Sequence, residues 1–114
     1  MQTMNRAMRA YETATTHRSL REQEADVFRR AIGALKAAQD GNAINRARAL
    51  ADNQRLWVAV NDLMRDPANQ LPAEFRASVV SVGSAVRREM ERAAPDFNFL
   101  ISVNEDIAAG LSSI

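Results

Sequence analysis

The sequence predicts an all-α protein: a single-domain helical bundle over residues 1–114, with about five helices of which the first is short. Three features of the chain lead to this class. Four glycines and three prolines are too few to punctuate a strand-rich fold. Apolar residues recur at intervals of three or four, as on one face of a helix. Alanine supplies 21 of the 114 residues, which favours a core built by close approach of helices.

The first two predicted helices lie before the Asp40-Gly41 pair, which ends the second of them. A short helix over about 3–14 is predicted from apolar residues at helical spacing. These are Met4, Met8 and Tyr11. Thr15 and Thr16 are β-branched, so we expect the short helix to end there. The bundle is then expected over about 19–112, and Ser19 would open its first helix with a capping box.

Three more helices are predicted after the second. Asn42 can cap the first of them, and its apolar face includes Trp57, which we expect in the core. Pro72 fits the first turn of the next helix, and Pro95 stops it. Asp96 can cap the last helix. The connections are short, as in a helical bundle.

The composition favours a binding protein over an enzyme. The chain has no cysteine, which excludes disulfides, thiolate zinc sites and cysteine catalysis. Its single histidine, His17, lies in a predicted polar turn, and no phosphate loop or nucleophile motif occurs. We therefore expect no enzymatic activity, no metal and no cofactor. No apolar stretch is long enough for a membrane span or a signal peptide, so a cytoplasmic protein is expected.

The charge is unevenly distributed, although the net charge is only +1. Residues 1–50 carry nine basic and five acidic residues, and residues 51–114 carry six and nine. The basic residues that could serve an RNA-binding surface are Arg18, Arg21, Arg29, Arg30, Arg46 and Arg48. No stacking aromatic residues lie among them, so direct nucleic-acid binding is not favoured.

Four polar residues interrupt the apolar stripes of four different helices. They are Glu24, Asn53, Arg76 and Asn104. Each would cost a few kcal/mol if buried without a partner. We therefore expect a shared buried network in which Glu24 and Arg76 form the ion pair. A role in fixing helix register is favoured over a role in binding.

Two groups of apolar residues exceed what a five-helix core needs. Phe99 and Val103 lie beside the main stripe of the last helix, and Met4, Met8 and Tyr11 lie on a helix too short to be stable alone. We expect these five residues to border a groove for a partner's helix. The alternative is that both groups belong to the core.

Short motifs run along nearly the whole chain. In order they are Tyr11, Glu24, Asn53-x-x-Leu56-Trp57, Leu71-Pro72-x-x-x-Arg76, Ser81-x-Gly83, Asn104-x-x-Ile107 and Gly110-Leu111. The combination resembles the FlaF family, small flagellar biosynthesis regulators of alphaproteobacteria. The resemblance implies a cytoplasmic protein that promotes flagellin production or export, acts alongside the regulator FlbT, and serves as a secretion chaperone for flagellin.

A chaperone role fits the predicted bundle. The terminal segments of flagellin are amphipathic helices, and a bundle with a spare apolar edge could cover one of them. The alternative is a post-transcriptional regulator that acts on flagellin mRNA directly or through FlbT. Only the basic first half favours it. The first helix could dock within its own chain or on another subunit.

Overall fold

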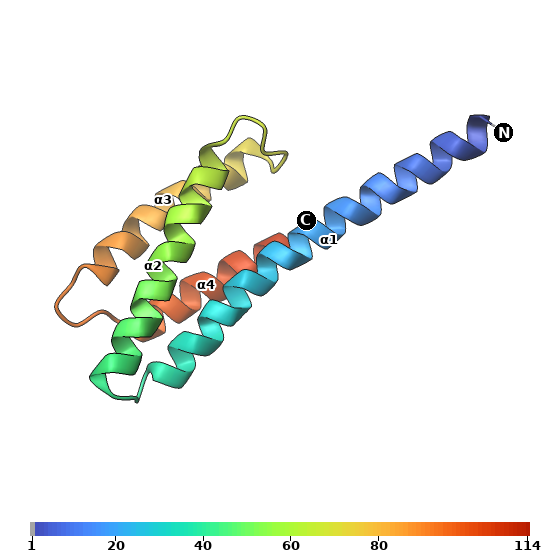
Figure 1. Cartoon of the computed structure of the whole chain (residues 1–114). Coiled ribbons are helices and arrows are strands. Elements are labelled where there is room, and N and C mark those ends of the chain that lie inside the picture. The colour runs from blue at the N-terminus through green and yellow to red at the C-terminus, as the bar shows by residue number, and fades with distance from the viewer. Residues whose placement is uncertain (1) are drawn as a thin grey trace.

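The chain folds into a helical bundle, shown in Figure 1. The computed structural model describes the backbone of residues 2–114 and the side chains of residues 5–14 and 20–114. The described chain forms four helices. They are α1 (Gln2–Ala38), α2 (Ala43–Arg65), α3 (Ala73–Met90) and α4 (Phe97–Ser112). The predicted all-α class is confirmed.

Helix α1 joins the first two predicted helices into one. It passes through Thr15, Thr16 and Ser19 without a break, so the separate short helix over about 3–14 and the capping box at Ser19 were wrong. His17 also lies in this helix and not in a turn. Each β-branched residue costs a helix only a few tenths of a kcal/mol. Extending an existing helix by one residue is much easier than starting a new one, so two threonines do not end it.

The predicted starts of the other helices are confirmed. Asn45 donates its backbone N–H to Asn42 Oδ1 at 2.8 Å, which caps α2. In the same way Phe99 donates to Asp96 Oδ1 at 3.2 Å, which caps α4. Pro72 is the residue immediately before α3, where its missing N–H costs no helical hydrogen bond.

The four helices run alternately up and down. Helix α1 packs against α2 and α4, and α3 packs against the same two helices from the other side. The pairing of α1 with α4 is antiparallel, because Gln39 contacts Asn98 at one end and Arg29 contacts Ser112 at the other. Helices α2 and α4 therefore lie diagonally opposite each other across the core.

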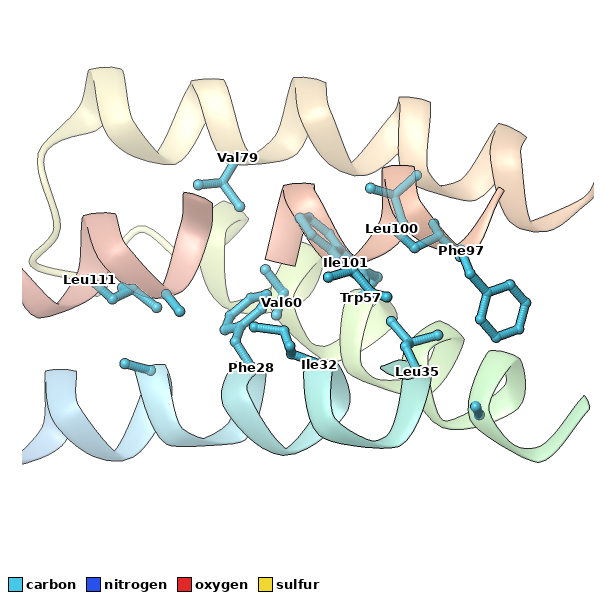
Figure 2. Close-up of a cluster of buried hydrophobic side chains, with 14 of the residues drawn as sticks. Phe28, Ile32, Leu35, Trp57, Val60, Val79, Phe97, Leu100, Ile101 and Leu111 are labelled. Atoms are coloured by element: carbon cyan, nitrogen blue, oxygen red, sulfur yellow. The ribbon is translucent and has the colours of Figure 1, made fainter. Parts of the chain in front are cut away.

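The core contains apolar side chains from all four helices (Figure 2). Trp57 is 3% exposed, which confirms its predicted place in the core. The Phe28 ring meets the indole edge-to-face, with 5.8 Å between ring centroids. Gly83 of α3 packs on the indole, since a Cβ there would lie 3.2 Å from Trp57 Cε3. The indole is thus enclosed by α1 and α3 as well as by its own helix.

Helix α1 is much longer than the bundle that it helps to form. Its 37 residues span about 55 Å, close to the 62 Å length of the molecule. Figure 1 shows its N-terminal half continuing beyond the C-terminus and beyond the connection between α2 and α3. We call residues 2–19 the projecting segment. None of the described helices has a stretch long and apolar enough to cross a membrane.

Candidate partner-binding surface

Two asparagines and the tryptophan form a hydrogen-bonded network in the core. Trp57 Nε1 donates to Asn104 Oδ1 at 2.9 Å, and Asn104 Nδ2 donates to Asn53 Oδ1 at 2.8 Å. Asn53 Nδ2 then contacts the sulfur of Met90 at 3.3 Å. Both asparagines have no exposed surface. The network joins α2 to α4 across the diagonal of the bundle.

The network is fully satisfied. Among the described residues, no buried side-chain nitrogen or oxygen lacks a hydrogen-bond partner. A shift of α2 along α4 by one turn would separate Asn53 from Asn104 and leave buried amides unpaired, at a cost of about 1–3 kcal/mol for each group. The network therefore fixes the register of these two helices.

Glu24 and Arg76 do not join this network, and the predicted ion pair between them was wrong. Glu24 accepts from Arg21 Nη1 at 2.7 and 2.9 Å, one turn earlier on α1. Arg76 Nε donates to the carbonyl of Leu71 at 3.0 Å, and Nη1 donates to the carbonyl of Met64 at 3.3 Å. Arg76 thus ties the end of α2 to the start of α3.

These contacts predict independent effects of the two charged residues on stability. We expect Arg76→Ala to lower the free energy of unfolding by about 1.5–3 kcal/mol, because two carbonyls lose a charged donor. Glu24→Ala should cost about 0.5 kcal/mol, since its ion pair is partly exposed. Urea denaturation of both single variants and the double variant measures the coupling. It should stay within about 0.5 kcal/mol, and a larger value would restore the ion pair between them.

The predicted partner-binding residues do not border one groove. Phe99 and Val103 are half-buried and pack against the core. They lie near the start of α4, which adjoins the C-terminal end of α1. Met8 and Tyr11 lie about 40 Å from that end along α1. The side chain of Met4 lies outside the described residues. The composite groove was therefore wrong, and a role in binding for Met8 and Tyr11 stays a prediction.

The projecting segment presents its apolar side chains to solvent. Every described side chain from Asn5 to Ala14 is exposed, with Met8 at 57% and Tyr11 at 69%. At about 100° per residue, the apolar side chains gather on one face of the helix. Those described are Ala7, Met8, Ala10, Tyr11 and Ala14. The charged residues lie on the opposite face, namely Arg6, Arg9 and Glu12. We call the first face the apolar face of the projecting segment.

Several arginines of the basic first half make contacts within the chain. Arg29 pairs with Asp26 at 2.6 Å, and this hydrogen bond raises the pKa of Arg29 further above the physiological range. Arg46 lies over the ring of Phe97, with 4.4 Å from its guanidinium carbon to the ring centroid, and it also donates to the carbonyl of Gln39. Arg21 pairs with Glu24. These contacts hold three of the six arginines against the bundle.

The motif residues mostly have structural roles that their spacing did not reveal. Gly83 faces the indole of Trp57, and Gly110 faces the Phe75 ring, where a Cβ would lie 3.1 Å from Cε2. Leu71 is buried in the connection between α2 and α3. The hydrogen bond from Trp57 to Asn104 was also not anticipated, although the position of Trp57 one turn after Asn53 places both on one face of α2.

Comparison with known proteins agrees with the motifs. The family model described as "Flagellar protein FlaF" matches residues 7–111, which is nearly the whole chain. No curated protein and no solved structure matches the chain. The match includes the asparagine network, the Arg76 contacts and much of the apolar face of the projecting segment. The chain therefore belongs to the FlaF family and is a flagellar protein.

Proposed function

We propose that this protein is a cytoplasmic chaperone that binds flagellin and promotes its production or export, without catalysis. The observation that carries the proposal is the apolar face of the projecting segment. It exposes Met8 and Tyr11 on a helix that extends beyond its own bundle, in a chain of a flagellar family. Flagellin is the partner that the family resemblance implies, and we propose one of its terminal helices as the segment that binds.

The proposed contact is helix against helix. An amphipathic helix of flagellin would lay its apolar side along the apolar face of the projecting segment, where alanines permit close approach. Met8 can adapt its rotamer to different partners, and Tyr11 supplies a large apolar area with a polar end. Because the charges of the segment lie on the opposite face, binding should be largely hydrophobic.

Deleting residues 2–14 should abolish flagellin binding and leave the bundle folded. The core side chains of α1 begin at Ala25, so the deletion removes none of them. The measurement is isothermal titration of purified flagellin into the full-length protein and the deletion variant, with circular dichroism as the folding control. Flagellin truncated at either end identifies the terminal helix that binds. A deletion variant that binds with unchanged affinity contradicts the proposed site.

A matched pair of substitutions sharpens the test. Tyr11→Asp places a charge on the apolar face and should weaken flagellin binding about tenfold or more, whereas Thr13→Asp places it outside that face and should not. Affinity should change little between low and high salt. An RNA complex would instead weaken steeply with salt. Steep salt dependence together with a requirement for Arg30 or Arg48 would favour the alternative, regulation of flagellin mRNA directly or through FlbT.

A further inference from the structure

The buried register of α1 continues into the projecting segment. Within the bundle, α1 buries Ala25, Phe28, Ile32 and Leu35 at alternating intervals of three and four residues, and it buries Ala38 at its end, three residues after Leu35. Counting back by three heptads from the first four leads to uncharged residues at each corresponding position, namely Met4, Ala7, Tyr11 and Ala14. Met4 is placed by its position in the helix alone. A heptad pattern of this kind is typical of a helix that packs against another along its length.

We call the four heptad positions Met4, Ala7, Tyr11 and Ala14 the seam of the projecting segment. The seam ends before the bundle begins. The same heptad positions are occupied by Arg18 and Arg21 at the junction, and Arg21 there pairs with Glu24. Positions that flank the seam are uncharged as well, including Met8 and Ala10. A partner helix would therefore fit over residues 4–14 and would meet no charge along that length.

We propose that a second copy of this chain occupies the seam, with the two projecting segments paired antiparallel. If each residue i lies opposite residue 18 − i, Ala7 faces Tyr11 of the other copy and Met8 faces its Ala10. Every large residue then meets an alanine, so one spacing between the helices satisfies all layers. The arrangement has two-fold symmetry, and the helix dipoles oppose each other.

Other pairings of two copies fit less well. An antiparallel shift by one heptad would place Arg18 opposite Ala7 and bury a guanidinium without a partner. A parallel pairing would stack Tyr11 on Tyr11 and Ala7 on Ala7. The tyrosine pair needs a wider separation of the helix axes than the alanine pair, so one separation cannot pack both. The charges of Arg6, Arg9 and Glu12 stay in solvent in the favoured pairing.

Self-pairing does not rest on the proposed flagellin binding. It would cover Met8 and Tyr11 and would support the residues after Thr13, whose helix propensity is low. If flagellin also binds this face, the second copy and flagellin exclude each other, and accumulating flagellin draws monomers out of the dimer. Failure of either idea would leave the other standing, because self-pairing is measured on the protein without flagellin.

Analytical ultracentrifugation of the full-length protein over a range of micromolar concentrations tests the pairing. We expect a reversible dimer. Ala7→Glu should weaken it about tenfold or more, because the charge enters the seam, whereas Thr13→Glu adds the same charge outside it and should not. Circular dichroism and the melting temperature of the dilute monomer control for folding. A protein that stays monomeric throughout, or a dimer that Ala7→Glu leaves unchanged, overturns the proposal.

Small-angle X-ray scattering tests the orientation. Two molecules of 62 Å whose helices overlap over residues 2–16, about 22 Å, give a dimer roughly 100 Å long. Side-by-side parallel pairing would keep the length near that of one molecule. A dimer of the shorter length therefore overturns the antiparallel arrangement.

Discussion

Trp57→Ala should lower the free energy of unfolding by about 3–5 kcal/mol, the range for truncating a buried aromatic residue. The indole is 3% exposed, meets Phe28 edge-to-face, and lies under Gly83. The substitution leaves a cavity between α1, α2 and α3. It also removes the indole N–H from which Asn104 Oδ1 accepts a hydrogen bond. A domain of this size is stable by only about 5–15 kcal/mol, so the variant loses a large share of its stability and should melt at a clearly lower temperature.

Urea denaturation followed by circular dichroism measures this effect, because the variant has no tryptophan fluorescence. Val58→Ala is the matched control, since Val58 is the next residue on α2 and is 52% exposed. Its cost should lie within about 0.5 kcal/mol. Equal destabilisation by the two substitutions would contradict the enclosed position of the indole.

Asn104→Ala should cost about 3 kcal/mol or more, although it removes a small side chain. It leaves both Trp57 Nε1–H and Asn53 Oδ1 buried without their partner, and each such group costs about 1–3 kcal/mol. The double variant with Asn53→Ala should cost less than the sum of the single variants, because one orphaned group disappears with its residue.

The indole proton gives a direct readout of this network. In the native protein the Nε1–H of Trp57 should exchange slowly with solvent, since its hydrogen bond to Asn104 is buried. In Asn104→Ala it should exchange faster and shift in the proton NMR spectrum. A cost below about 1 kcal/mol with an unchanged indole resonance would show that water or another group replaces the amide.

Periodicity in the sequence predicted the faces of the helices well. Trp57, Asn53 and Asn104 were assigned to buried faces from their spacing, and the structure places them there. The caps at Asn42 and Asp96 were equally accessible, because the hydrogen bond that makes a cap spans only three residues. Local signals of this kind do not depend on the packing of distant helices.

The errors share a physical cause, which is that a helical pattern gives an angle around the axis but no position along a neighbouring helix. Arg76 is half-buried and lies level with the end of α2, where two backbone carbonyls accept hydrogen bonds from its guanidinium. Glu24 found a partner in Arg21, one turn away on its own helix. The groove failed for the same reason, since the antiparallel placement of α4 puts Phe99 far from Tyr11.

The unbroken course of α1 could not be derived from Thr15 and Thr16 alone. Their cost is a few tenths of a kcal/mol each, which the rest of a 37-residue helix offsets. Because α1 is continuous, the apolar face of the projecting segment lies beyond the end of the bundle.

The hydrogen bonds between α2 and α4 also determine when the bundle can finish folding during synthesis. Asn53 and Trp57 leave the ribosome well before Asn104, which lies 51 and 47 residues later. Until α4 emerges, the side of α1 that α4 covers has no neighbour, and Trp57 Nε1 and Asn53 Oδ1 have only water as a partner. A nascent chain should therefore remain open and protease-sensitive until α4 has left the ribosome. Nonsense mutations before Asn104 should consequently yield no folded product.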